Sequence, residues 1–438
     1  MSGPYLLAVI AFAITGPPDE WARQMDLAIL SVAERNLEQA LNLTQSACGS
    51  EQSLPSHRRA MCHQLKGHIL SAHGDFTPAL QEFGLAESYW RQTAPELRPP
   101  EAISALAVGS AIAKKSMGRL IEAEAELRQA LRAMQNLPGD KGLHIAECLF
   151  ELSRTTGALG KLGEAESFAI AASEAYRSLG PQYSRAFANS QLTLAQIYMR
   201  GGDYRRSLEA AQSAEAAARE HATPITREYA GILVVLAASY RLTGDPDRAL
   251  PLARKALQVF ESPQEKSSEE RVAALREAGL LELNQNKLTR AAELLQMAVA
   301  AARSQFGEDS IQVAVIESDL GHVLSLQDDF PAGESVLRHA LQTVASRQAG
   351  PFAEGAVHLH LAQLFERAER HPAAETHFAR SVDLFKAALG QNHIDTARAL
   401  ECYARFLKHI RSPKAKEIAN EAKHASEASK KRETQAGP

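Results

Sequence analysis

The chain has little of what sheet-rich, nucleic-acid-binding or disulfide-rich proteins contain. Phe, Trp and Tyr make up only 6% of its 438 residues, and Val, Ile and Thr are sparse beside Ala, Leu, Glu and Arg, which favours helices over strands. The 48 Lys and Arg against 52 Asp and Glu leave a net charge of -4, so no overall field attracts nucleic acid. The four cysteines show no C-x-x-C spacing, which excludes a disulfide framework and gives no sign of a structural zinc site.

Common catalytic and cofactor-binding motifs are also missing. The sequence has no phosphate loop ending in GK[ST], no G-x-S-x-G, no H-E-x-x-H, no EF-hand loop and no dinucleotide fingerprint. The densest histidine run, His57, His63, His68 and His73, has steps of five or six residues, which wind around a helix instead of aligning on one face. We therefore expect no enzymatic activity, no metal and no cofactor.

Small residues recur with a period of about 42 residues, and this repeat dominates the sequence. The first column contains Ala28, Gly67, Ala111, Ser153, Ala195, Ala237, Gly279, Gly321 and Ala362. A second column follows twelve residues later, from Ala40 and Ala79 to Ala374, and a third seven residues after that, from Ala47 and Ala86 to Ala422. Three such columns indicate an array of structural repeats.

Each repeat is predicted to be a hairpin of two helices. Turns that contain Gly74, Gly118, Gly201, Gly202 or Gly244 separate the first two columns, and glycine favours the left-handed conformation that ends a helix. Helix A carries the first small residue and helix B the other two, so the axes can approach closely. One hairpin cannot bury both of its faces, and the repeats must therefore stack into a continuous core.

The repeat resembles the tetratricopeptide repeat, and its 42-residue step is similar to the kinesin light chain type. Two segments that match one another, Phe306–Ala314 and Leu389–Ala397, resemble the Leu-Gly-x-x-His-Pro-x-x-Ala link of that family, with Ile in the place of Pro. The resemblance implies an all-α, right-handed solenoid of stacked hairpins. It implies little about function, because one fold supports many functions.

The organisation that follows has four parts. Residues 1–18 form an apolar N-terminal segment, 19–412 a solenoid of nine repeats, 413–429 a degenerate tenth repeat or capping helix, and 430–438 a disordered tail. The apolar run Tyr5–Ile14 is too short to span a bilayer but has the length of a signal-peptide core, although no basic residue precedes it. The protein is therefore either cytoplasmic, with these residues docked as a cap, or exported to a compartment such as the periplasm.

Cys48 and Cys62 flank Pro55 symmetrically, at the end of one helix B and the start of the next helix A. Antiparallel packing of these helices would bring the two thiols within bridging distance. They form a disulfide if the protein is exported, and are otherwise two buried thiols.

The resemblance places a ligand-binding groove along the A helices. The candidate groove residues are Arg154, Asn189, Gln196, Arg200, Arg241 and Arg276. Arginine binds a carboxylate with a planar two-donor fork, and asparagine can hold a peptide backbone, so this surface fits an acidic segment or a free C-terminus. The alternative is an ordinary solvated face on which Glu147, Glu151 and Glu277 neutralise the arginines.

The function expected from these features is a non-enzymatic scaffold that binds a protein or peptide in its groove, without nucleic acid and without a membrane span. Two alternatives remain open: a regulatory module whose curvature changes when it binds a peptide, and an enzyme whose motifs are not recognisable. Self-association through the terminal repeats is a further expectation, because apolar end surfaces associate unless they are capped.

Overall fold

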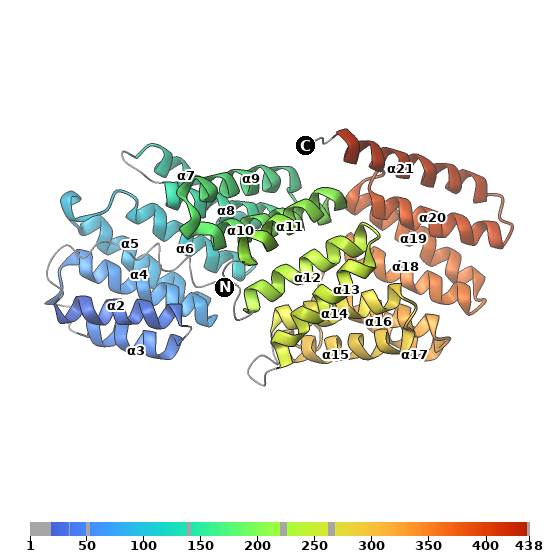
Figure 1. Cartoon of the computed structure of the whole chain (residues 1–438), viewed down its shortest axis with the longest axis horizontal. Coiled ribbons are helices and arrows are strands. Elements are labelled where there is room, and N and C mark those ends of the chain that lie inside the picture. The colour runs from blue at the N-terminus through green and yellow to red at the C-terminus, as the bar shows by residue number, and fades with distance from the viewer. Residues whose placement is uncertain are drawn as a thin grey trace. The chain divides into compact units, whose positions relative to one another are not determined.

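The computed structural model describes residues 19–34, 36–49, 53–137, 142–219, 226–261 and 268–435. These residues form helices joined by short links, with no strand among them (Figure 1). The predicted apolar segment at residues 1–18 lies outside the described residues. Two compact units, Met1–Ile197 and Tyr198–Pro438, are referred to below as the N-terminal and C-terminal units. None of the helices in the described ranges is long and apolar enough to cross a membrane.

The N-terminal unit consists of helical hairpins in sequence order. Its helices are α2 (Glu20–Ala33), α3 (Leu37–Cys48), α4 (Ser56–His73), α5 (Phe76–Gln92), α6 (Ala102–Ser116), α7 (Leu120–Gln135), α8 (Gly142–Ala158), α9 (Leu162–Leu179) and α10 (Ser184–Arg200), whose last turn enters the C-terminal unit. Two single 3-10 turns, η2 (Pro95–Leu97) and η3 (Pro181–Tyr183), lie in the links.

The C-terminal unit continues the same alternation. Its helices are α11 (Tyr204–Arg219), α12 (Arg227–Leu242), α13 (Pro246–Gln258), α14 (Glu269–Asn284), α15 (Leu288–Phe306), α16 (Ile311–Leu326), α17 (Phe330–Ser346), α18 (Pro351–Arg367), α19 (His371–Leu389), α20 (Ile394–His409) and α21 (Ala415–Gln435), with a 3-10 turn η4 (Val259–Glu261) after α13. Even-numbered helices are A helices and odd-numbered helices are B helices. Within each unit the A helices pack on the B helices that follow them, as α8 does on α9 and α18 on α19, and A helices such as α12 and α14 also contact one another.

Close packing between the helices explains the columns of small residues. Ala111, Ala195 and Ala362 are fully buried. A Cβ atom on Gly321 would lie 2.5 Å from Cγ of Leu337, a separation that no real contact adopts, so helices α16 and α17 could not pack this closely around a larger residue. The predicted all-helical solenoid of hairpins is confirmed.

A single left-handed residue ends helix A in most hairpins. Glycine occupies this position in five turns of the described chain, at Gly74, Gly118, Gly160, Gly202 and Gly244. In the last four turns the residue is Asn286, Asp328, Glu369 or Arg411, with φ of 57°, 64°, 56° and 56°. The fold therefore imposes the left-handed conformation even where the sequence gives no glycine signal.

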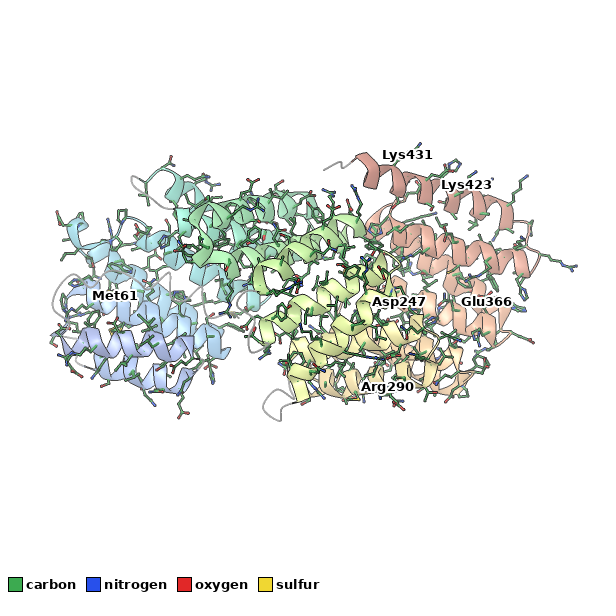
Figure 2. The ribbon with its side chains drawn as sticks, in the orientation of Figure 1. Met61, Asp247, Arg290, Glu366, Lys423 and Lys431 are labelled. Atoms are coloured by element: carbon green, nitrogen blue, oxygen red, sulfur yellow. A yellow bond between two sulfur atoms is a disulfide. The ribbon has the colours of Figure 1, made fainter. Side chains whose placement is uncertain are left out.

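The final helix is longer than the sequence analysis predicted. Helix α21 continues to Gln435, so the stretch 430–435 is helical where a disordered tail was expected, and 436–438 lie outside the described residues. The helix is anchored by Ala422 and Ala425, which are buried in the core of the last repeats, and by an ion pair between Lys386 and Glu421 at 2.6 Å. Its outer face carries exposed lysines such as Lys423 (Figure 2), as a terminal repeat requires.

The two predicted bridging cysteines lie together in the structure. Cys48, the last residue of α3, is bonded to Cys62 in α4, with a Cα–Cα distance of 6.2 Å. Both side chains are buried. Cys148 and Cys402 are free thiols.

Candidate peptide-binding groove

The predicted groove residues all lie on A helices. In the N-terminal unit, Arg154 lies on α8, and Asn189 and Gln196 lie on α10. In the C-terminal unit, Arg200 ends α10, Arg241 lies on α12 and Arg276 on α14.

Arg154 belongs to an ion-paired cluster that joins α6 to α8. Nζ of Lys115 on α6 contacts Oε2 of Glu151 on α8, and Nη1 of Arg154 donates to the other oxygen of Glu151 at 3.1 Å. The carboxylate of Glu151 is only 6% exposed. Burial acts to raise the pKa of Glu151, but Lys115 and Arg154 outweigh it and hold the pKa below its ordinary value. Arg154 is thus neutralised within the protein.

Glu147 lies one turn before Glu151 on the same face of α8. It is 5% exposed. Burial raises the pKa of Glu147 to about 8, with a smaller contribution from the negative charge of Glu151. Glu147 is therefore mostly protonated at neutral pH and does not neutralise the nearby arginine.

Two arginines of the C-terminal unit form ion pairs with carboxylates on the next A helix. Nε and Nη2 of Arg241 donate to the two oxygens of Glu277 on α14 at 2.7 and 3.1 Å. Nε of Arg276 donates to Oδ2 of Asp319 on α16 at 2.6 Å. The charge of Asp319 raises the pKa of Arg276. These pairs match the internally neutralised alternative of the sequence analysis.

The ion pairs follow the repeat itself. Lys115 and Arg241 each lie four residues after a first-column small residue, and their partners Glu151 and Glu277 each lie two residues before the next one. Both pairs therefore span 36 residues. They connect successive A helices in the same register, which fixes one A helix against the next. This spacing is the sequence signal that would have identified these two pairs, whereas the pair of Arg276 with Asp319 spans 43 residues and does not follow it.

Farther along the C-terminal unit, uncharged polar side chains also join two neighbouring A helices. The hydroxyl of Ser318 on α16 lies 2.8 Å from Nδ1 of His360 on α18, and the imidazoles of His322 and His360 stack at 4.7 Å. Burial, then the neighbouring imidazole of His360, lowers the pKa of His322 to about 3. Both rings are neutral at physiological pH, because burial lowers the pKa of His360 as well. This histidine pair was not predicted from the sequence.

Three of the predicted residues lie on α10, and two of them are exposed. The side chains of Gln196 and Arg200 are exposed, and Asn189 is half-buried, with its backbone carbonyl accepting a hydrogen bond from the hydroxyl of Thr193 at 3.0 Å. Gln196 and Arg200 therefore present exposed side chains on the same helix.

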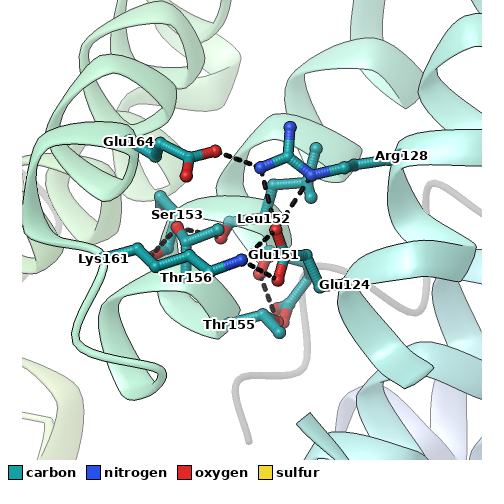
Figure 3. A network of polar contacts seen from close by, with 9 residues as sticks. All are labelled: Glu124, Arg128, Glu151, Leu152, Ser153, Thr155, Thr156, Lys161 and Glu164. Atoms are coloured by element: carbon teal, nitrogen blue, oxygen red, sulfur yellow. Dashed lines mark hydrogen bonds and ion pairs between the residues drawn. The ribbon is translucent and has the colours of Figure 1, made fainter. Parts of the chain in front are cut away.

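The B-helix side of the N-terminal unit has an ion-pair network of its own (Figure 3). Glu124 on α7 accepts hydrogen bonds from Arg128 at 2.9 Å and from Lys161, at the start of α9, at 2.8 and 3.0 Å. Arg128 also contacts Glu164 on α9. The network joins consecutive B helices, so charged residues stabilise the stacking on this side as they do between the A helices. Among the described residues, no group of three His, Cys, Asp or Glu side chains is placed to hold a metal ion.

The stacked hairpins define a class of helical-repeat proteins, and two family models identify the repeat. Both are described as tetratricopeptide repeats, and they match residues 102–178 and 230–262. These two parts of the chain match the tetratricopeptide repeat, as the spacing of the small residues predicts. No curated protein matches the sequence significantly.

Solved structures share the fold at low sequence identity. The apo form of RapI is 14% identical, with a TM-score of 0.61, and the match covers 86% of this chain and 100% of that one. A Rap protein complexed with Competence and Sporulation Factor is 11% identical, with a TM-score of 0.64 and coverage of 86% and 99%. The apo quorum sensor NprR from B. thuringiensis is 15% identical, with a TM-score of 0.59 and coverage of 83% and 98%. At these identities the likeness concerns the fold alone.

Proposed function

We propose that this protein is a non-enzymatic scaffold that binds a peptide or an extended protein segment along its A helices. The observation that carries the proposal is the regular ion pairing of neighbouring A helices, Lys115 with Glu151 and Arg241 with Glu277. Such pairs hold the inner helices in a fixed register before a ligand arrives. A preorganised surface binds with a smaller entropic cost, and this favours a binding function for the solenoid.

The proposed ligand is an acidic segment or a free C-terminus, and its proposed contact is the exposed part of α10. Arg241 and Arg276 already donate to Glu277 and Asp319, so a ligand carboxylate would have to displace a buried partner there. Gln196 and Arg200 are exposed on α10. A guanidinium and a neighbouring amide together suit a carboxylate and the peptide bond beside it.

Site-specific cross-linking tests the proposed surface. A photoreactive amino acid is placed at Gln196 on α10, and the control is the same amino acid at Ile170 on the B helix α9, where the side chain is 37% exposed. After irradiation in the native cells, adducts are expected from position 196 and not from position 170. Equal yields at the two positions, or adducts from position 170 alone, would contradict binding along the A helices.

The charge of the ligand is tested in the same experiment. Arg200→Glu in the protein that is labelled at position 196 should lower the adduct yield at least severalfold, because two carboxylates then repel one another. Arg205→Glu on the B helix α11 changes the net charge equally and should leave the yield unchanged. Equal yields with both variants would contradict an acidic ligand while leaving a neutral peptide acceptable.

A second candidate function is a peptide sensor, which the solved structures of similar fold favour. One of these is a Rap protein in complex with Competence and Sporulation Factor, and another is the quorum sensor NprR. A sensor of this kind would change its curvature when it binds a peptide. Small-angle scattering with and without the cross-linked ligand distinguishes the two functions: a scaffold keeps its radius of gyration, whereas a sensor changes it.

A further inference from the structure

The first hairpin turn of the C-terminal unit touches a link near the end of the same unit. The hydroxyl of Tyr204, the first residue of α11, donates to Oδ1 of Asp395 in the first turn of α20 at 3.2 Å, across 191 residues. Helices α11 and α20 meet at this point in Figure 1. In a linear array each repeat contacts only its neighbours. A contact over this separation means that the C-terminal unit closes on itself.

The contact is a small packed interface. Tyr204 and His393 are each 7% exposed, and the guanidinium of Arg398 lies over the ring of Tyr204 at 5.6 Å from its centre. Arg398 also pairs with Asp395 at 3.4 Å. Burial, reinforced by Asp395, raises the pKa of Tyr204, so the phenol keeps its proton and remains a hydrogen-bond donor. The residues Gly202, Tyr204, His393, Asp395 and Arg398 are called the clasp below.

Gly202 makes the close approach sterically feasible. A Cβ atom at this position would lie 2.9 Å from Nε2 of His393 and 3.0 Å from Cγ2 of Ile394. The corresponding turn glycines Gly118 and Gly244 would have no atom within 4 Å of an added Cβ. Their backbone is equally left-handed, with φ of 79° and 87° against 79° for Gly202. The turn at Gly202 therefore requires glycine for a second reason, which is the close approach of His393 and Ile394.

The side chains of the clasp are specific to these two places in the repeat array. The residue that corresponds to Tyr204 is Phe, Leu, Pro or His in the other hairpins of the chain, and none of these carries a hydroxyl. The link two repeats before His393 and Asp395 has Ser310 and Gln312 at the same positions. The hydrogen bond is thus not a general property of the repeat.

We propose that the clasp is an intramolecular interface that fixes the curvature of the C-terminal unit, and that its opening is the step by which this unit changes shape. This inference rests on the proposed function, because the clasp would then determine how a peptide reaches the inner faces of α12 to α20. While the clasp is closed, an extended segment can enter along the axis of the unit. A folded domain can reach the same helices only after the clasp opens. The two ends of the unit are coupled because neither half of the interface is buried without the other.

Hydrogen exchange of the full-length protein without ligand tests the clasp. Gly202→Ala should speed amide exchange about tenfold both around the substituted turn and at residues 391–400, because opening exposes both halves of the interface. Gly244→Ala is the matched control: it introduces the same left-handed alanine but no clash, so its effect should stay in its own turn. Unchanged exchange at residues 391–400 in Gly202→Ala would overturn the proposal.

Two further variants keep the test independent of the stability of the turn. Tyr204→Phe removes only the hydroxyl and should speed exchange at residues 391–400 by a smaller factor. Asp395→Ala should speed exchange at the start of α11, whereas Gln312→Ala, at the same place in the earlier link, should not. Protection that rises with protein concentration would instead identify a contact between two copies and would also overturn the proposal. Because no ligand is present, these results do not depend on the cross-linking at Gln196.

Discussion

Arg241 on α12 holds Glu277 on α14 through two hydrogen bonds of 2.7 and 3.1 Å, and thereby joins two successive A helices. The carboxylate is 7% exposed and the guanidinium 19% exposed. Loss of one partner from such a pair leaves a buried charge without compensation. The arrangement explains why an arginine predicted to bind a ligand contributes to the stability of the repeat array.

Removal of this arginine should destabilise the protein. Arg241→Ala is expected to lower the free energy of unfolding by about 3 kcal/mol, because Glu277 remains buried and unpaired. The control is Arg290→Ala on α15 (Figure 2), whose pair with Glu293 is more than half exposed on both sides, and which should cost less than about 1 kcal/mol. Urea unfolding measures both values. Similar losses for the two variants would mean that the pair between α12 and α14 contributes no more than a surface pair.

Glu147 should make the stability of the protein depend on pH. Its pKa is about 8 in the folded chain against an ordinary value of 4.5, so between these values the folded state holds a proton that the unfolded state has lost. Stability must therefore fall as the pH rises from about 4.5 to 8. Glu147→Gln removes this dependence, and its melting temperature should exceed that of the wild type increasingly over this range.

The variant Glu151→Gln is a control of opposite sign for this prediction. Lys115 and Arg154 hold the pKa of Glu151 below its ordinary value of 4.5. The ionised carboxylate therefore stabilises the fold at pH values above 4.5, and the substitution should destabilise the protein at neutral pH. Melting curves at pH 5, 6, 7 and 8 would contradict the prediction for Glu147 if the Gln variant and the wild type changed in parallel.

The disulfide between Cys48 and Cys62 should stabilise the first repeats. The bridge closes a loop with a sequence separation of 14, for which loop entropy gives a stabilisation of about 3 kcal/mol. A reducing agent should lower the melting temperature of the wild type and leave a Cys48→Ala, Cys62→Ala double variant unchanged. An equal effect of the reducing agent on both proteins would show that the bridge does not carry the stabilisation.

The same cysteines report on the compartment. Protein from its native source, denatured and alkylated without reduction, should gain two alkyl groups if it is exported, because Cys148 and Cys402 are free. Four alkyl groups would indicate a reduced protein and would support the cytoplasmic alternative.

Glycine should relieve strain in the last turns between A and B helices. Glu369 and Arg411 have φ of 56°, a conformation that costs a residue other than glycine roughly 1–2 kcal/mol. Glycine avoids this cost, but its larger conformational freedom in the unfolded chain cancels roughly 0.5–1 kcal/mol of the gain. Glu369→Gly and Arg411→Gly should each raise the free energy of unfolding by about 0.5–1 kcal/mol. Glu401→Gly, at an exposed position within α20, should lower it by about 1 kcal/mol.

These turns show how far the sequence predicts the repeat. Gly74, Gly118, Gly202 and Gly244 indicated where helix A ends, since glycine is the residue that takes the left-handed conformation most easily. Asn286, Asp328, Glu369 and Arg411 take the same conformation without such a signal, and only the 42-residue period indicated a turn there. The end of the last helix was placed too early, because Ala422 and Ala425 dock on α20 and extend a helix that looks fully solvated in sequence.

The candidate groove was predictable in its helices but less so in its accessible residues. The repeat spacing placed Arg154, Arg241 and Arg276 on A helices, and the acidic residues Glu151 and Glu277 were recognised as competitors of a ligand. Whether each arginine is available to a ligand or is neutralised within the protein depends on the position of its charge relative to the next A helix. The partner of Arg276, Asp319, is 43 residues away and was not recognised from the sequence.

By itself the sequence determined the helical hairpins, their order, and the small residues at which they pack. These features repeat locally, and each depends on residues within one repeat or the next. Only the tertiary structure decided which charges are paired, which groove residues remain exposed, and that Tyr204 meets Asp395. The physical reason is that the rotation of each repeat against the next is small and adds up over the array, so a contact across 191 residues depends on all the interfaces between them.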